Sequence, residues 1–322
     1  MSREVLRWSD EVDSVVRGDL TVAAAYPTPA GGAILSSLSP IGLADRESTR
    51  LSFTTSLGFP RKLEHILARP RVSLAYHTRD HGFAESDAFV LAQGRATVDL
   101  EPDSQRLAGI RQSIELFLGA PPSGPIWDRV LREYHQRRVF VDVDIERLTV
   151  WPDLAARGTA QVTGAPDPGT APAQSPPKNG TAPRVDVPSL QRRIARLGHR
   201  LLAYEGADGL PVVVPVEISS FDEGGLHLDV TPGILPPGGR RAGLLAHRFE
   251  ARCVGLSTRT FTGWLTVGDE GVMYAPHTAK SLSIPPNYSI MMLMNGLGSK
   301  IGVRRARRDG TVERLQALAQ KV

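Results

Sequence analysis

The sequence predicts an α+β protein in which two small antiparallel β-barrels follow one another along the chain, each with a few helices. The chain has 322 residues, two to three times the usual size of one domain. A stretch rich in Ala, Gly, Pro, Ser and Thr, residues 155–188, divides it into two blocks of similar length. Short strand-like segments separated by turn residues recur in both blocks, and this pattern is typical of small barrels.

The composition is that of a globular protein and excludes several classes. Hydrophobic residues make up 41% and charged residues 22% of the chain. The net charge of +4 is too small to indicate a nucleic-acid-binding protein by itself. The single cysteine, Cys253, excludes an intramolecular disulfide and a Cys-rich zinc or iron–sulfur site. Only 5 of the 38 Lys and Arg residues are lysines, so the position of each lysine is informative.

No segment predicts export or membrane insertion. The N-terminal residues are charged and lack the apolar core of a signal peptide. The apolar run at residues 290–294 is far shorter than the ~20 residues that span a bilayer. We therefore expect a cytoplasmic protein that has no membrane partner.

The stretch at residues 155–188 predicts a linker. Its composition buries too little apolar surface to offset chain entropy, so we expect it to be flexible or partly extended. The expected domains are therefore residues 1–154 and residues 189–322, of which the second ends in a basic tail.

The first block mixes strands and helices in an order that suits a small antiparallel barrel. Ser9 is a suitable N-cap for a helix to Val16, and Pro70 ends a helix whose apolar face includes Leu63. Two more helices are expected at residues 104–118 and 126–136, where apolar residues recur every three or four positions. The expected strands are residues 20–25, 33–38, 51–54, 72–77, 89–98 and 139–151.

The second block repeats this order loosely. A helix at residues 190–197 precedes strands at 199–204, 212–218 and 226–230. Arg240 and Arg241 then begin a helix-like stretch at 242–247. Residues 261–267 correspond to residues 91–98 around Gly263 and Gly94. We interpret the order as a tandem duplication; the alternative is two unrelated β-rich domains.

Residues 51–66 carry the clearest functional signal. A strand ends in three hydroxyl side chains, a Gly/Pro turn follows, and two cations occupy the first turn of the next helix. Cations there oppose the helix macrodipole, and a bound anion would remove the conflict by accepting bonds from helix-start amides, hydroxyls and an Arg fork. The segment therefore predicts a phosphate site. The alternative is an exposed Arg-Lys pair after a hydroxyl-capped turn.

The run from Phe53 to Leu74 also resembles the signature of the pyridoxamine 5′-phosphate oxidase-like split-barrel family, a group that includes flavin and deazaflavin oxidoreductases. Residues 90–98 and 139–151 resemble the next strand and the closing strand of that family. The resemblance covers residues 10–152 well and residues 190–275 weakly. It implies two tandem split β-barrel-like domains, of which the first binds the cofactor and the second is degenerate.

The resemblance implies eight cofactor-binding residues. Those expected at the phosphate are Thr54, Thr55, Ser56, Arg61 and Lys62, and those expected along the ring, through backbone groups, are Ser36, Ser37 and Leu38. FMN is the first candidate because the motif is a compact phosphate site, the deazaflavin F-420 is the second, and haem is the third. A flavin ring itself carries hydride or electrons to a small-molecule substrate, so no catalytic side chain is required.

The resemblance also implies how the two halves assemble, and two other hypotheses about function stay open. Family members usually form dimers with the cofactor at the interface, so we expect the two halves to form an intramolecular pseudo-dimer, with a homodimer as the alternative. A protein that binds or sequesters a flavin or haem without turnover is a second hypothesis. A third hypothesis is a nucleic-acid-associated protein that uses the basic tail, which includes Lys300 and Lys321, although a nucleic-acid partner is not expected.

Two further patterns predict no site. The histidines lack carboxylate partners at metal-ligand spacing, so no metal site is expected. The glycines at residues 296–302 fit neither phosphate-loop pattern, and we expect a turn that ends a helix.

Overall fold

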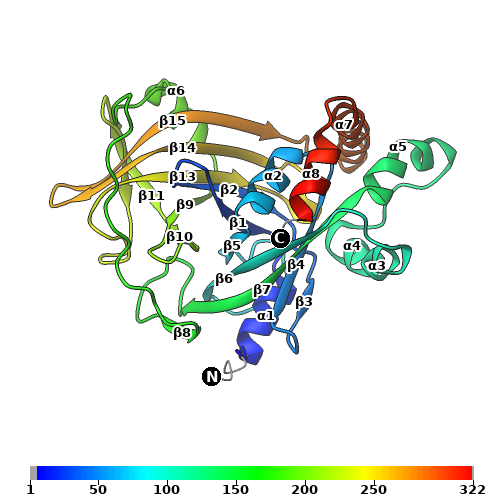
Figure 1. Cartoon of the computed structure of the whole chain (residues 1–322), viewed down its shortest axis with the longest axis horizontal. Helices are drawn as coiled ribbons and strands as arrows, with labels where there is room; N and C mark the ends of the chain where they lie inside the picture. Colours follow the sequence, from blue (N-terminus) through cyan, green and yellow to red (C-terminus); the bar gives the residue numbers. More distant parts are fainter. Residues whose placement is uncertain (1–5, 321–322) are drawn as a thin grey trace.

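The structure is a computed structural model that describes residues 6–320, and it consists of two antiparallel sheets packed against each other (Figure 1). The strands of the first sheet are β1 (Val22–Pro27), β2 (Ala33–Leu38), β3 (Ala44–Asp45), β4 (Arg50–Ser56), β5 (Arg71–Tyr76), β6 (Phe89–Asp99), β7 (Arg138–Trp151) and β8 (Gln161–Gly164). Those of the second are β9 (His199–Glu205), β10 (Pro211–Pro215), β11 (Glu217–Asp222), β12 (Gly225–Asp229), β13 (Gly238–Arg248), β14 (Ser257–Gly268) and β15 (Gly271–Ser283).

The two sheets have the same strand order. It is β2-β1-β5-β6-β7-β4-β3 in the first sheet and β10-β9-β13-β14-β15-β12-β11 in the second, so every strand except β8, which pairs with β7 beside this path, has a counterpart at the same place. Gly94 on β6 and Gly263 on β14 stand at equivalent bulges. A Cβ on either glycine would lie 2.1–2.2 Å from a backbone oxygen of the neighbouring strand, so both bulges require glycine. The expected α+β architecture of two tandem barrel-like halves is confirmed.

Eight α-helices lie around the sheets in the part of the chain that the structure describes. They are α1 (Asp10–Gly18), α2 (Pro60–Ala68), α3 (Ser104–Gly109), α4 (Arg111–Leu118), α5 (Pro125–Gln136), α6 (Val187–Ile194), α7 (Tyr288–Arg308) and α8 (Thr311–Ala319). Ser9 caps α1 by accepting a hydrogen bond from the Val12 amide at 3.2 Å, as expected. Within residues 6–320, no helix has the length and apolarity needed to cross a membrane.

Three expectations about local structure are wrong. The helix expected at residues 104–118 is two helices that meet at Ile110. The stretch at 242–247 belongs to strand β13, which is buried on both faces: Leu244 packs in the core of the second half and Leu245 packs between the halves. A strand buried on both faces has no polar alternation, so its pattern is easily mistaken for a buried helix.

The third error concerns the glycines at residues 296–302, which lie inside α7 and do not end it. A Cβ on Gly296 would lie 2.7 Å from Cγ1 of Val130 on α5, and a Cβ on Gly302 would lie 2.6 Å from Cα of Gly58. These glycines therefore allow α7 to approach its neighbours closely. Lys321, the last residue of the expected basic tail, lies outside the described residues.

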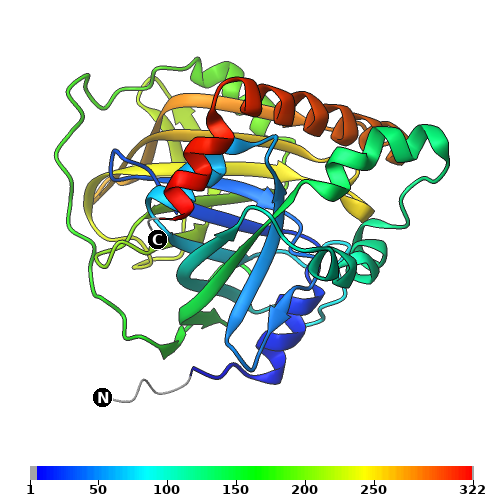
Figure 2. The same cartoon turned by 45° about the vertical axis from the view of Figure 1, so that its right-hand side comes forward.

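Residues 155–188 run extended along the surface, seen as the long green strap in Figure 2. The short strand β8 within them pairs with β7. Further along, Gln174 donates hydrogen bonds to both halves: its backbone amide donates to Gly239 O and its Nε2 donates to Gly31 O, each at 2.7 Å. The strap therefore contacts the two halves that it connects.

The two halves meet through an apolar cluster formed by β1, β2, β5 and β6 of the first half and β9, β10 and β13 of the second. At its centre β2 and β13 are so close that a Cβ on Gly243 would lie 2.4 Å from the Ala33 carbonyl oxygen. The interface includes small residues such as Ala23 and Ala203. Close backbone approach thus fixes how the halves are placed.

A pair of buried histidines adds a polar contact between the halves. Nδ1–H of His77 donates to the Ala75 carbonyl at 3.0 Å, so Nε2 of His77 accepts from Nε2–H of His247 at 2.7 Å. Nδ1 of His247 then carries a lone pair, which agrees with its having no partner among residues 6–320. Burial lowers the pKa of His77 to about 3 and lowers that of His247 well below its usual range, so both rings are neutral.

The close approach of β2 and β13 gives a first prediction. Gly243→Ala should lower the free energy of unfolding by about 1–3 kcal/mol, because the added methyl collides with the Ala33 carbonyl and forces the strands apart. Gly268→Ala is the control, since nothing lies within 4 Å of its Cβ position. Urea unfolding of both variants measures the difference, and equal stabilities would contradict the packing described here.

The histidine pair gives a second prediction. The unfolded chain takes up protons on these histidines below about pH 6.5 and the folded chain does not, so the free energy of unfolding should fall as the pH drops from 7 to 5. His247→Gln removes one of the groups and keeps a donor for His77. It should reduce the slope by at most about 1.4 kcal/mol per pH unit. Identical slopes in urea titrations at pH 5–7 would refute a neutral pair.

Candidate functional site

The expected site residues lie around one cavity of about 360 Å³, here called the inner cavity, which both halves line. Its walls come from β2, β4, α2, α4 and α5 of the first half and from β14, β15 and α7 of the second. Seven of the eight predicted residues line it: Ser36, Ser37, Leu38, Thr54, Thr55, Ser56 and Lys62. Arg61 is exposed and lines a neighbouring pocket that shares Ser36, Lys62, Thr258 and Thr260 with the inner cavity.

Lys62 is the cation that the fold places in this cavity. It stands in the first turn of α2, where Pro60 begins the helix and no side chain caps the first amides. Among residues 6–320, no acidic side chain forms an ion pair with Lys62. Burial lowers the pKa of the Lys62 ammonium to about 8. A partly desolvated ammonium without a counterion is suited to bind an anion.

The hydroxyl groups divide into structural and free ones. Ser56 accepts a hydrogen bond from the Gly58 amide at 3.1 Å and so caps the turn before α2. Ser37 and Thr21 line the inner cavity, and their hydroxyl oxygens are buried without a hydrogen-bond partner among the described residues. Buried hydroxyls are normally paired, so these two groups have unused hydrogen-bonding capacity at the cavity wall.

Strand β2 offers backbone groups as well. It is the edge strand of the first sheet and pairs only with β1, through the register that joins Ala24 to Ser36 and Val22 to Leu38. An edge strand presents backbone N–H and C=O groups that no neighbouring strand uses. The expectation that Ser36, Ser37 and Leu38 offer backbone groups to a ligand is thus compatible with the position of β2.

Sequence reasoning missed Arg138, the second cation at this cavity. The β4–β7 register sets Arg138 opposite Ser56, and its Nη1 donates to Thr54 Oγ1. The side chain is 8% exposed and its guanidinium lies over the Tyr134 ring, 4.8 Å from the ring centre. Its Nε and Nη2 have no partner among residues 6–320. Only the fold reveals this site, because an arginine before a strand carries no signal of its own.

The second half supplies the opposite wall. Thr258 and Thr260 of β14 and Met291 and Met292 of α7 line the cavity, and the two methionines also pack in a small apolar cluster with α5. Cys253 lines it too, and burial raises the pKa of its thiol to about 12, so no thiolate nucleophile is present at neutral pH. The second half therefore forms part of the wall of the inner cavity.

The arginine pair of the second half has a structural position. Arg240 is 1% exposed and donates to the carbonyls of Ala171, Pro236 and Pro237. Neither Arg240 nor Arg241 lines the inner cavity. Both lie on β13, the counterpart of β5, whereas Lys62 lies on α2. The two basic pairs therefore occupy different places in the repeated topology.

Helix α7 holds the turn that presents Lys62. Ser299 is buried against Gly58, whose Cβ position lies 3.3 Å from Ser299 Cα, and Gly302 makes the close approach described above. The turn from Ser56 to Pro60 is thus held between β4 and α7. A fixed turn keeps the ammonium and the helix-start amides in one place, which lowers the entropy lost when an anion binds.

The side chains around the inner cavity are suited to binding a ligand with negative charge. The inner cavity combines an apolar body and free hydroxyls with three cations that form no ion pair among residues 6–320: Lys62, Arg138 and the exposed Arg252. Within residues 6–320, no group of three or more His, Cys, Asp and Glu side chains could hold a metal ion. Such a cavity suits a planar ligand that carries an anionic group.

Comparison with known proteins adds similarity in structure. The sequence matches no model of a protein family and no curated protein. A haem-binding protein from Mycobacterium smegmatis is 14% identical, with 94% of this chain and 100% of that chain covered and a TM-score of 0.32.

Two further solved structures cover less of the chain. A pyridoxamine 5′-phosphate oxidase-related, FMN-binding protein from Nostoc punctiforme is 11% identical (62% and 87% covered, TM-score 0.29), and an F-420 reductase is 14% identical (42% and 94% covered, TM-score 0.31). The solved structures to which the chain is similar thus include pyridoxamine 5′-phosphate oxidase-related proteins, the class that its sequence resembles.

Proposed function

We propose that the inner cavity binds a phosphate-bearing flavin, FMN first, and that the protein is a flavin-dependent oxidoreductase. The observation that carries the proposal is the pair of cations without counterions, Lys62 and Arg138, in one cavity with an apolar body. Leaving a buried charge unpaired is costly, so a chain that keeps two in one cavity gains from an anionic ligand there.

Different residues of the inner cavity would contact different parts of the flavin. Lys62, the first-turn amides of α2 and Thr55 would hold the phosphate, and Arg138, which donates to Thr54, would add positive charge nearby. The edge of β2 would bind the polar side of the ring, and Met291 and Met292 would cover its apolar part. The bound flavin would supply hydride or electron transfer, and the protein would orient the ring and exclude water.

F-420 is the second cofactor candidate, because the neighbouring pocket adds Arg61 and Lys280 to the cations near Lys62 and so could take a longer anionic ligand. A protein that binds a flavin or haem without turnover remains the alternative function. We further infer that the shared strand order of the two sheets reflects a tandem duplication that encloses the cofactor site within one chain.

The cofactor is tested by titration of the full chain with FMN, F-420 and haem, followed by absorbance. We expect FMN to bind and its absorption bands to shift as the ring enters an apolar cavity. Addition of a nicotinamide donor and then of an acceptor distinguishes an oxidoreductase from a binding protein, because only the former cycles between reduced and oxidised spectra. No binding of any of the three ligands would overturn the proposal.

A third prediction concerns Lys62. Lys62→Met should weaken FMN binding about 10- to 100-fold, since a charge-assisted contact is worth about 1.5–3 kcal/mol. The same variant should raise the melting temperature of the ligand-free protein, because it removes a half-buried charge that has no acidic partner among residues 6–320. Arg61→Met is the matched control and should change affinity less than about threefold, since Arg61 lies outside the inner cavity. Wild-type affinity in Lys62→Met would reject the assignment.

A fourth prediction is the pH dependence of binding. The FMN phosphate stays a dianion above pH 7, whereas the Lys62 ammonium of the free protein loses its proton near pH 8. FMN affinity should therefore fall as the pH rises from 7 to 9. Lys62→Arg keeps its charge through this range, so its affinity should stay level. Parallel profiles for the two proteins in fluorescence titrations would contradict a role for Lys62 at the phosphate.

A further inference from the structure

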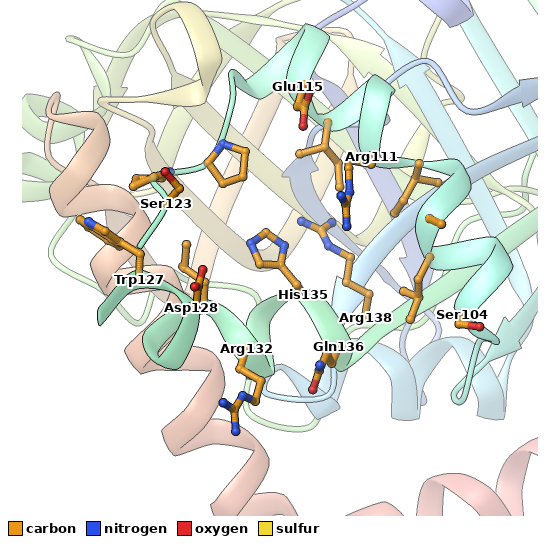
Figure 3. Close-up of a pocket in the computed structure, with 17 residues that line it drawn as sticks. Ser104, Arg111, Glu115, Ser123, Trp127, Asp128, Arg132, His135, Gln136 and Arg138 are labelled. Carbon is orange, nitrogen blue, oxygen red and sulfur yellow. The ribbon is translucent and has the colours of Figure 1, made fainter. Parts of the chain in front are cut away.

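A second cavity, here called the outer cavity, adjoins the inner one. It has a volume of about 590 Å³ and lies between α3, α4 and α5 (Figure 3). The two cavities share four lining residues, Ile114, Pro121, His135 and Arg138. Arg138 therefore stands at the boundary between them, and a molecule in the outer cavity would lie beside a ligand in the inner cavity.

Three arginines without an acidic partner among residues 6–320 line the outer cavity: Arg111, Arg132 and Arg138. Figure 3 shows Arg132 pointing away from the other two. Figure 3 shows the guanidinium groups of Arg111 and Arg138 next to each other, with the His135 ring beside them. Neither arginine forms an ion pair within residues 6–320, although Glu115 and Asp128 line the same cavity. Arg138 is more than nine-tenths buried, and its Nε and Nη2 have no partner among these residues.

Both arginines are close enough to His135 for their charges to act on its ring. Burial lowers the pKa of His135, and the positive charges of Arg138 and Arg111 lower it further. Like charges that converge without a counterion repel each other, and an anion between them would relieve the repulsion while accepting bonds from both forks. Trp127 and Leu107 line the remainder of the cavity and suit an apolar or aromatic body.

We infer that the outer cavity binds a second small molecule, an organic anion with an apolar or aromatic body, whose carboxylate or phosphate contacts Arg111 and Arg138. The inference rests on the proposed cofactor in the inner cavity and names the class of its substrate. Lys62 lines only the inner side, and Arg111 lines only the outer side. Each ligand would thus have a cation of its own, and Arg138 would stand between the two.

The test uses benzoate as the probe and benzamide as its uncharged analogue. Trp127 lines the cavity, so benzoate binding to the full chain should change tryptophan fluorescence, and Trp127→Phe should abolish that change. Benzamide should bind at least tenfold more weakly, because it carries no charge for the arginines. Calorimetry on the same samples gives affinities that do not depend on fluorescence.

Arg111→Gln is the main variant because Arg111 is exposed at the cavity wall and its replacement should leave the fold intact. It should weaken benzoate binding about tenfold and leave FMN affinity within about threefold of the wild-type value. Arg137→Gln is the matched control: Arg137 is the neighbour of Arg138, pairs with Glu133 at 3.6 Å and does not line the cavity, so benzoate affinity should not change.

Adding benzoate before or after FMN distinguishes a failure of this inference from a failure of the proposed function. Benzoate should bind with similar affinity to free and FMN-saturated protein, since the anionic groups have separate sites. Displacement of one by the other, no benzoate binding to the wild type, or equal binding to wild type and Arg111→Gln would overturn the inference. Benzoate binding to a chain that binds no FMN would instead support the outer anion site and reject the cofactor.

Discussion

The close packing of β2 against β13 is the constraint on which the rest of the structure depends. Gly243 lets β13 approach the Ala33 carbonyl of β2, and the small side chains around them let the two sheets join in one apolar cluster. This contact brings the edge strand that carries Ser36 and Ser37 to within reach of Thr258 and Thr260 on β14. Each half alone would leave the inner cavity without one of its walls.

A second feature of the structure is a set of binding groups without partners, which lower the stability of the ligand-free chain. Lys62 and Arg138 are desolvated without counterions, and Ser37 and Thr21 keep buried hydroxyls unpaired. Each such group lowers the stability of the ligand-free chain by an amount that a ligand could recover. Arg240 differs, because both Nη atoms of its buried guanidinium donate to carbonyl groups and only its Nε has no partner among residues 6–320.

Much of the first half could be predicted from sequence because its signals are local. Ser9, Pro70 and the period-two strands set the bounds of elements, and the hydroxyl and Lys62 positions follow from one contiguous segment. Arg138 could not be predicted, since it reaches the cavity only through the register of β7 with β4. Arg61 was expected beside Lys62, but adjacent residues on a helix point in different directions, and Arg61 lines the neighbouring pocket.

The second half was harder to predict for physical reasons. Strand β13 is buried on both faces, so its apolar run lacks alternation, and the glycines of α7 reflect contacts with Gly58 and Val130 that are distant in sequence. Pairing with two neighbouring strands then overrides local propensity in β13. The repeated strand order, in contrast, is visible once the strands are paired, and it relates the two halves more clearly than their residues do.

The most direct test of the account is a crystal structure of the full chain grown with FMN. The account predicts the phosphate within hydrogen-bond distance of Lys62 Nζ, with the ring between β2 and the methionines of α7. Flavin bound outside the inner cavity, or bound there with its phosphate away from both Lys62 and Arg138, would contradict it.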